Sequence, residues 1–129
     1  MKRLLLLAAL LAAADLRAAQ CTATSIADTA TAIARGHAYA KHVTHGAEFR
    51  RGRVIAGLPY PLPSVVSKAL FAERIAAAMR DGVDKPLANR RHAYWQPSTG
   101  TVVITNRNAK DCGTAFRPNN GRRYYESLR

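Results

Sequence analysis

The spacing of apolar residues after the first twenty positions predicts an amphipathic helix. Apolar side chains recur at steps of three and four residues over positions 26–40, which places them on one face of a helix. We expect this helix to run from about residue 25 to residue 43. Gly36 weakens the pattern without ending it, and Gly46 is the expected stop.

A loop and a second helix are expected next. Residues 50–63 contain two glycines, three prolines and three arginines, a composition that indicates a cationic loop. Helical spacing then returns, and we expect a helix from residue 64 or 67 to Arg80, ended by Gly82. Glu73 and Arg74 should face water. The expected buried stripe consists of Leu70, Phe71, Ile75, Ala78 and Met79.

From residue 92 onward the hydrophobic period changes to two, which predicts β-strands. Residues 92–96 and 101–106, joined by a turn, have the pattern of a hairpin. Further strands are expected over 114–117 and 122–125, whereas 83–91 is expected to be a polar connection. Helices followed by strands predict an α+β fold, with two N-terminal helices packed on a small C-terminal antiparallel sheet.

The first 19 residues have the pattern of a secretory signal peptide. A basic tip precedes 11 apolar residues at positions 4–14, which is shorter than the about 20 residues that span a bilayer. Small residues at positions 18 and 19 offer a cleavage site. We expect residues 1–19 to be the leader and residues 20–129 to form one domain, exported to the periplasm or the extracellular space without an integral membrane segment. Cys21 suggests a lipoprotein as an alternative, which Gln20 disfavours because lipidation normally needs a small residue there.

The cysteines and the charge agree with export and with an anionic partner. Cys21 and Cys112 are the two cysteines, and in an oxidising compartment one disulfide is the favoured interpretation over two free thiols. The formal charge is +12, and it is still +10 without residues 1–19. The domain itself is therefore basic, which excludes an acidic binding protein and points to a polyanion.

Three of the four histidines fall within nine residues near the end of the first expected helix. On a helix, His37 and Lys41 lie one turn apart on the same face, whereas His42 lies about 140° around the axis from His37. Both imidazoles can reach one site only if the helix ends or bends there. The alternative interpretation is a solvated basic helix end, which the helix dipole favours.

Zinc is a second alternative for these histidines. Their spacing lacks the His-Glu-x-x-His pattern, and Glu48 is the only nearby carboxylate. Cys112 is better used in a disulfide. We therefore expect neither a metal nor another cofactor.

The C-terminal half of the chain combines basic and aromatic residues. Basic side chains bind phosphates, and flat rings stack on unpaired bases. Thr114, beside a cation, can hold a phosphate oxygen, although a β-branched residue can also serve sheet packing alone. Alternation along strands requires about half of the aromatic residues to fill the core, and we expect Trp95 there, between the sheet and the helices. The remaining candidates for substrate contact are Arg90, Arg91, His92, Tyr94, Arg117, Arg122, Arg123, Tyr124 and Tyr125.

These residue types match the chemistry of RNA cleavage. The 2′-hydroxyl attacks its own phosphate, so the enzyme needs a base, an acid and cations for the developing charge. Histidine, which titrates near neutral pH, serves as either acid or base. Lysine, arginine and threonine can bind the phosphate.

Several short motifs resemble those of a known group of ribonucleases. The motif Gly36-His-Ala-x-x-Lys-His-Val43 is similar to the start of nuclease domains found at the C-termini of bacterial polymorphic and contact-dependent inhibition toxins. The group is that of the barnase–EndoU–colicin–RelE-like ribonucleases, and the likeness covers about residues 35–128. The motifs similar to its sheet half are Arg91-x-x-Tyr94-Trp95, Thr99-Gly-Thr-Val-Val-Ile104, Gly113-Thr-Ala-Phe-Arg-Pro118 and Tyr124-Tyr125.

The resemblance implies helices packed on an antiparallel sheet and cleavage without a metal. It gives His37 or His42 the role of general base and places Lys41 beside the phosphate. It implies RNA as substrate and a cognate immunity or inhibitor protein as a second partner. The residues that it assigns are His37, Lys41, His42, Thr114 and Tyr124 for catalysis, with Arg91, Arg117 and Tyr125 for substrate binding.

We therefore expect a secreted basic ribonuclease or toxin-like domain that cleaves RNA by metal-independent transphosphorylation. The alternative is a non-catalytic cationic envelope protein that binds anionic surfaces or nucleic acid. The enzyme requires the histidines and Lys41 to meet Thr114 and Tyr124 in one cleft, whereas the alternative predicts that these groups lie far apart. Geometry distinguishes the two functions.

Overall fold

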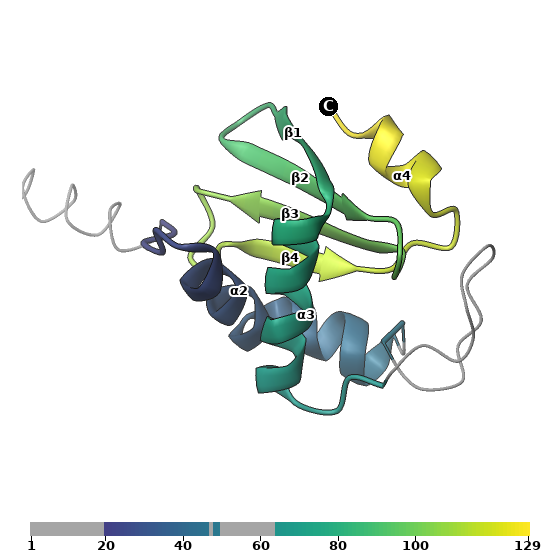
Figure 1. Ribbon diagram of the computed structural model, residues 1–129. Helices are drawn as coiled ribbons and strands as arrows, with labels where there is room; N and C mark the ends of the chain where they lie inside the picture. Colours follow the sequence, from purple (N-terminus) through teal and green to yellow (C-terminus); the bar gives the residue numbers. More distant parts are fainter. Residues whose placement is uncertain (1–19, 47, 50–63) are drawn as a thin grey trace, which may run out of the picture.

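The computed structural model describes residues 20–46, 48–49 and 64–129. The expected signal peptide, residues 1–19, and the expected cationic loop, residues 50–63, lie outside these described residues. Within them the fold is α+β, as expected, with helices packed on a four-stranded antiparallel sheet (Figure 1).

The expected helix over 25–43 is two elements in the structure. Helix α2 spans Ile26–Arg35 and begins where the Ser25 hydroxyl accepts a hydrogen bond from the Asp28 backbone N–H. It ends at Gly36, which takes an extended conformation, and the chain continues as the π-helix η1, Tyr39–His45. Gly46 ends η1, as expected. The prediction that the helix continues through Gly36 is therefore wrong, because this residue turns the chain onto a new axis.

Helix α3, Lys68–Asp81, confirms the second expected helix. The Ser67 hydroxyl caps its start by accepting from the Leu70 N–H, and Gly82 ends it. Most of the expected stripe is buried, although Leu70 is only partly buried. This stripe packs against α2 and the sheet.

The four strands follow each other in order across the sheet. They are β1 Val83–Leu87, β2 Arg91–Gln96, β3 Thr101–Asn106 and β4 Gly113–Phe116. The expected hairpin is β2 and β3, paired so that Tyr94 opposes Val103. The prediction of a polar connection over 83–91 is wrong, since β1 lies there. As an edge strand with a mostly exposed surface, β1 tolerates Pro86 and lacks the alternation that marks a half-buried strand.

The expected fourth strand over 122–125 is also absent, and helix α4, Arg122–Ser127, replaces it. Gly121 turns the chain with a φ of 54°, and an ion pair between Arg122 and Glu126 spans one helical turn at 2.8 Å. The Tyr125 side chain extends from this helix and is buried against the sheet. Packing on the sheet face thus overrides the strand preference of adjacent tyrosines.

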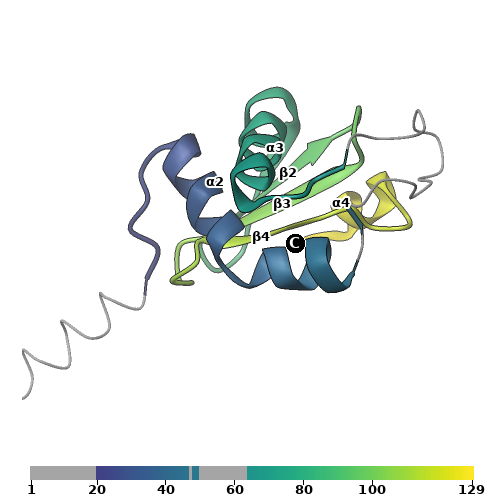
Figure 2. The same ribbon diagram turned by 90° about the horizontal axis from the view of Figure 1, so that it is seen from below.

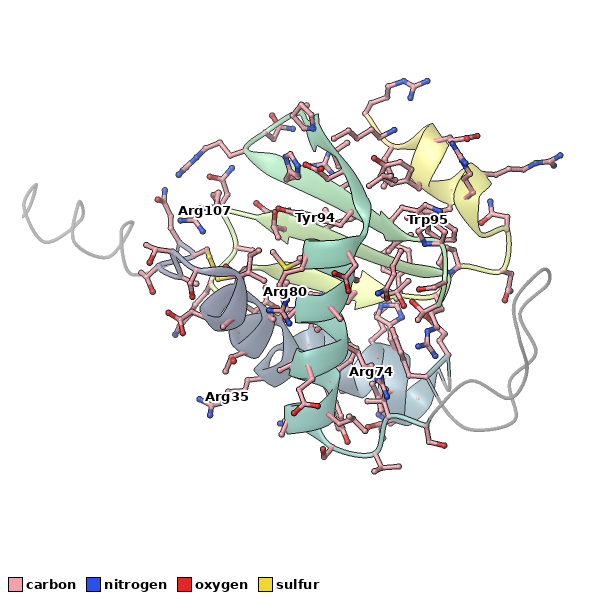
Figure 3. The ribbon with its side chains drawn as sticks, viewed as in Figure 1. Arg35, Arg74, Arg80, Tyr94, Trp95 and Arg107 are labelled. Carbon is pink, nitrogen blue, oxygen red and sulfur yellow. A yellow bond between two sulfur atoms is a disulfide. The ribbon has the colours of Figure 1, made fainter. Side chains whose placement is uncertain are left out.

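Two hydrophobic clusters lie on opposite faces of the sheet. Tyr94, Val103 and Ala115 face the cluster formed with α2, η1 and α3. Trp95 is buried, as expected, but it lies on the other face, beneath α4 (Figure 3). Its predicted place between the sheet and the N-terminal helices is therefore wrong, because Tyr94 takes the inward position of β2. Strand β4 is an edge of the sheet, and η1 runs beside it (Figure 2).

The predicted disulfide between Cys21 and Cys112 is confirmed. It joins residues 91 positions apart, and closing a loop of that length stabilises a fold by about 4–5 kcal/mol in chain-entropy terms. The Arg107 side chain adds a second tie by donating to the Ala23 carbonyl at 2.5 Å. The segment before α2 is thus fixed to the β3–β4 loop. Among the described residues, no helix is both long and apolar enough to span a membrane.

Candidate active site

A pocket of about 580 Å³ lies where η1, β4 and α4 come together. All five residues expected to be catalytic line it, from three separate stretches of the chain. One of the two expected arginines, Arg117, also lines it. The complete lining is His37, Lys41, His42, Glu48, Ile104, Thr114, Phe116, Arg117, Pro118, Asn119, Asn120 and Tyr124.

The break at Gly36 brings both histidines to this pocket. His37 lies just after α2 ends, whereas His42 lies within η1. On one continuous helix their side chains would diverge by about 140°. The change of axis between α2 and η1 removes that divergence, which is the bend that the sequence requires for a shared site.

His42 is buried and held by a carboxylate. Its Nδ1 lies 2.7 Å from Oε1 of Glu48, and the two side chains are 11% and 17% exposed. An ionised carboxylate only accepts hydrogen bonds, so Nδ1 carries the proton and Nε2 remains for the pocket. Glu48 is fixed in turn by the Arg117 backbone N–H, which donates to Oε2 at 2.9 Å. The His42 ring also packs against Phe116, with 5.4 Å between the ring centroids.

His37 has the same arrangement with a different carboxylate. Its Nδ1 contacts Oδ2 of Asp111, and its backbone N–H donates to the same oxygen at 3.4 Å. Burial raises the pKa of the Asp111 carboxyl, but hydrogen bonds from His37 and from the Gly113 N–H, with the His37 charge, outweigh burial. The net pKa therefore lies below the usual 3.8. Asp111 stays ionised at neutral pH and keeps Nε2 of His37 available to a ligand.

Gly36 permits the close approach of His37 and Asp111. A Cβ atom at position 36 would lie 2.5 Å from the Asp111 Cβ atom and 2.8 Å from its Oδ2 atom. Carbon atoms in ordinary contact are about 3.5–4.0 Å apart, so a side chain here would displace Asp111. The residue that ends α2 therefore also lets Asp111 reach His37.

Thr114 lines the pocket from β4. Its Oγ1 atom is buried and has no hydrogen-bond partner among the described residues. An unpaired buried hydroxyl costs free energy, about 1–3 kcal/mol. Since Thr114 lines the pocket, a turn of its side chain that exposes Oγ1 would let a ligand oxygen satisfy this hydroxyl, so Thr114 is a candidate binding group as well as a strand residue.

Two cationic side chains and two aromatic rings line the pocket. Lys41 is exposed at the pocket. Arg117 is 3% exposed and is held by the Thr101 hydroxyl, to which its Nε donates at 3.2 Å, and by the Phe49 ring at 4.5 Å. It therefore contributes a fixed positive charge to the wall. Tyr124 lines the pocket from α4, edge-on to Phe116 at 5.0 Å.

Two residues expected to bind substrate lie outside the pocket lining. The Arg91 guanidinium donates to the backbone carbonyls of Ala88 and Arg129, each at 3.1 Å. Tyr125 is buried beneath α4, where burial and then the charge of Asp84 raise the pKa of its phenol. Neither residue therefore reaches this pocket, because adjacent tyrosines on a helix point about 100° apart and the Arg91 guanidinium is bound by carbonyls beside the start of β2.

The sequence patterns do not indicate the carboxylates that orient the histidines. The spacing presents Glu48 only as a possible metal ligand, and nothing near Asp111 in the sequence marks it as a partner of His37. Chemistry alone could have pointed to these carboxylates, since a histidine with a fixed tautomer needs a hydrogen-bond acceptor for its second ring nitrogen. Across residues 20–46, 48–49 and 64–129, no cluster of three or more His, Cys, Asp or Glu side chains is arranged to hold a metal ion.

The pocket therefore combines two oriented imidazoles, a free hydroxyl, an ammonium group, a fixed guanidinium and two aromatic rings. Such a set can transfer protons at two points and bind an anion between them. Comparison of the chain with family models, curated proteins and solved structures finds no match.

Proposed function

We propose that this protein is an endoribonuclease that cleaves RNA by transphosphorylation, without a metal ion. The observation that carries the proposal is the pair of imidazoles in one pocket, each held through Nδ1 by its own carboxylate. Cleavage of this kind needs one group to take a proton and another to give one. Two histidines with available Nε2 atoms match that need.

In the proposed reaction the 2′-oxygen attacks the adjacent phosphorus. One imidazole takes the 2′-hydroxyl proton, and the other gives a proton to the 5′-oxygen as the bond between phosphorus and that oxygen breaks. The products are a 2′,3′-cyclic phosphate end and a 5′-hydroxyl end. Positioned proton transfer contributes about 10²–10⁴-fold to such a reaction.

The other lining residues would bind the phosphate and the base. Thr114 would donate its hydroxyl to a non-bridging oxygen, and Lys41 with Arg117 would offset the charge that develops. Phe116 and Tyr124 form an apolar wall on which an unpaired base can stack. An unpaired base requires single-stranded RNA at the point of cleavage.

The disulfide supports action outside the cytosol, because such bonds persist in oxidising compartments. The alternative, a non-catalytic cationic envelope protein, accounts for the charge but requires no convergence of histidines, lysine and threonine. Their convergence in one pocket favours the enzyme. A cognate inhibitor protein remains part of the proposal as an expected partner.

The test is incubation of the purified, oxidised protein with total RNA, with and without EDTA. We expect cyclic phosphate ends in both samples. His37→Ala and His42→Ala should each remove cleavage while leaving salt-sensitive RNA binding intact. His92→Ala is the matched control, because His92 also contacts a carboxylate, Asp84 at 2.5 Å, but lies outside the pocket.

Unchanged cleavage in both histidine variants would remove the imidazoles from the mechanism. Inhibition by EDTA would refute a metal-independent reaction. Salt-sensitive binding without any cleavage by the unmodified protein would favour the non-catalytic alternative.

A further inference from the structure

A second hollow adjoins the candidate active site. It has a volume of about 510 Å³ and is lined by Ala32, Arg35, Gly36, Lys110 and Asp111. The contact between His37 and Asp111 separates the two spaces, since His37 lines the first pocket and Asp111 lines the second. The two hollows therefore lie on either side of this contact.

The hollow carries two uncommitted cations. Arg35, in the last turn of α2, and Lys110, in the β3–β4 loop, are both exposed. Neither has an ion pair or a side-chain hydrogen bond within the described part of the chain. Figure 3 shows Arg35 extending away from α2 into solvent. Both side chains are therefore available to an anion.

The one acidic residue of the hollow is already engaged. Oδ2 of Asp111 accepts from His37, and Oδ1 accepts from the Gly113 N–H at 3.4 Å. The negative charge of Asp111 is therefore already paired with His37. The free charge that the hollow offers to a ligand is that of a guanidinium and an ammonium group, which are the side chains that bind phosphate best.

We propose that this hollow is a second phosphate site, which binds the phosphate of a nucleotide flanking the cleaved one. This inference rests on the proposed function and deepens it, because it makes a polymeric single strand the preferred substrate over a dinucleotide. The two sites follow the backbone of one RNA chain, with Gly36 and the His37–Asp111 contact between them.

The first test is binding of a fluorescent 12-nucleotide 2′-deoxy oligonucleotide, which lacks the nucleophile and is not cleaved. Each phosphate contact contributes about 0.7 to the slope of log K against log salt for a single strand. Because the hollow would hold one phosphate, the variant Arg35→Gln/Lys110→Gln should lower the slope by about 0.7 and weaken binding about 5-fold at 0.1 M salt, if ion release supplies the whole effect. The control Lys68→Gln/Arg80→Gln removes the same charges from α3, and its slope should stay close to that of the unmodified protein.

The second test is cleavage of a 12-nucleotide RNA and of a dinucleoside monophosphate. The Arg35→Gln/Lys110→Gln variant should raise KM for the longer substrate, leave kcat unchanged, and cleave the dinucleotide as the unmodified protein does. Equal loss on both substrates would place the two cations in the first pocket and overturn the proposal. An equal change of slope in the α3 control would reduce the effect to net charge and also overturn it.

The binding test separates this inference from the proposed function. If the unmodified protein cleaves no RNA but the slope still falls only in the Arg35→Gln/Lys110→Gln variant, the phosphate site stands and the ribonuclease fails. Binding of inorganic phosphate is measured in the same two proteins. If the Arg35→Gln/Lys110→Gln variant loses this binding but keeps the salt slope of the unmodified protein for the oligonucleotide, the hollow is a free-anion site and the proposal is wrong. Equal melting temperatures of the variants exclude misfolding as the cause.

Discussion

Replacing Gly36 with alanine tests whether the His37–Asp111 contact supports activity. Gly36 has φ of −85° and ψ of −160°, a conformation open to alanine. The new methyl would lie 2.5 Å from the Asp111 Cβ atom, about 1 Å closer than carbon atoms pack. Because the nearest atom is a Cβ atom, whose position the backbone sets, the loop that carries Asp111 would shift by about that distance, and the hydrogen bond from Asp111 to His37 would break.

The expected effects on activity and on stability differ in size. A misplacement of about 1 Å at a catalytic group costs about 10²-fold in rate. By contrast, alanine restricts the unfolded chain and stabilises a protein by about 0.4–1 kcal/mol where the backbone accepts it. This gain offsets part of the cost of a contact that forces a backbone shift, which is about 1–3 kcal/mol. Gly36→Ala should therefore lose most of its activity while its free energy of unfolding falls by about 1–2 kcal/mol.

A double-mutant cycle on a dinucleotide substrate measures whether the effect passes through Asp111. The variants are Gly36→Ala, Asp111→Gly, which removes the Cβ atom that the methyl would meet, and the two combined, each assayed for kcat/KM and for denaturant unfolding. If the methyl acts by displacing Asp111, it should cost nothing further once Asp111 is absent. Full activity in Gly36→Ala, or additive losses in the cycle, would refute the reasoning.

Three further predictions concern the groups around the two imidazoles. Thr114→Val should lower kcat about 10²–10³-fold, as loss of an oxyanion donor does. Its melting temperature should stay equal or rise, because an unpaired buried hydroxyl is removed. Thr114→Ser should keep activity, and an active valine variant would contradict the proposed role of the hydroxyl. Glu48→Gln should lower kcat about 10²-fold or more, with ¹⁵N NMR showing a changed tautomer balance at His42; an unchanged spectrum would contradict positioning by Glu48. Because the pKa of Asp111 is lowered in the fold, its contribution to stability is present above about pH 4 and lost as the pH falls through the lowered pKa. Asp111→Asn should therefore be less stable than the unmodified protein at pH 6 and equally stable near pH 2, and a constant difference in unfolding midpoint across that range would contradict this.

The periodic parts of the fold could be predicted from the sequence because each buries one face. Helix α3 and the β2–β3 hairpin follow apolar spacing with clear capping and turn residues. Strand β1 could not be predicted, since an edge strand that is mostly exposed carries no alternation. Helix α4 could not be predicted either, because adjacent tyrosines favour a strand until the sheet face offers one of them a place in the core.

The candidate site divides in the same way. Histidine, lysine, threonine and tyrosine were predicted as residue types that suit phosphate chemistry. The two carboxylate partners could not be predicted, because the spacing of residues along the chain does not show which side chains the fold brings together. Asp111 lies 74 residues from His37, and Glu48 lies six residues from His42 across the end of η1. Only the folded arrangement of β4, its preceding loop and the break at Gly36 brings them into range.

The same loop connects the site to the disulfide. Cys112 lies between Asp111 and the start of β4, so the bridge to Cys21 anchors the backbone on which both Asp111 and Thr114 are carried. Gly113, with a φ of 135°, lets that backbone enter the sheet where a side chain would collide with the Ile104 carbonyl. Because residues 111–114 include the carboxylate partner of His37, the disulfide cysteine and the proposed phosphate-binding Thr114, stability and site geometry are coupled there. The candidate site therefore depends on the same disulfide that ties the fold together.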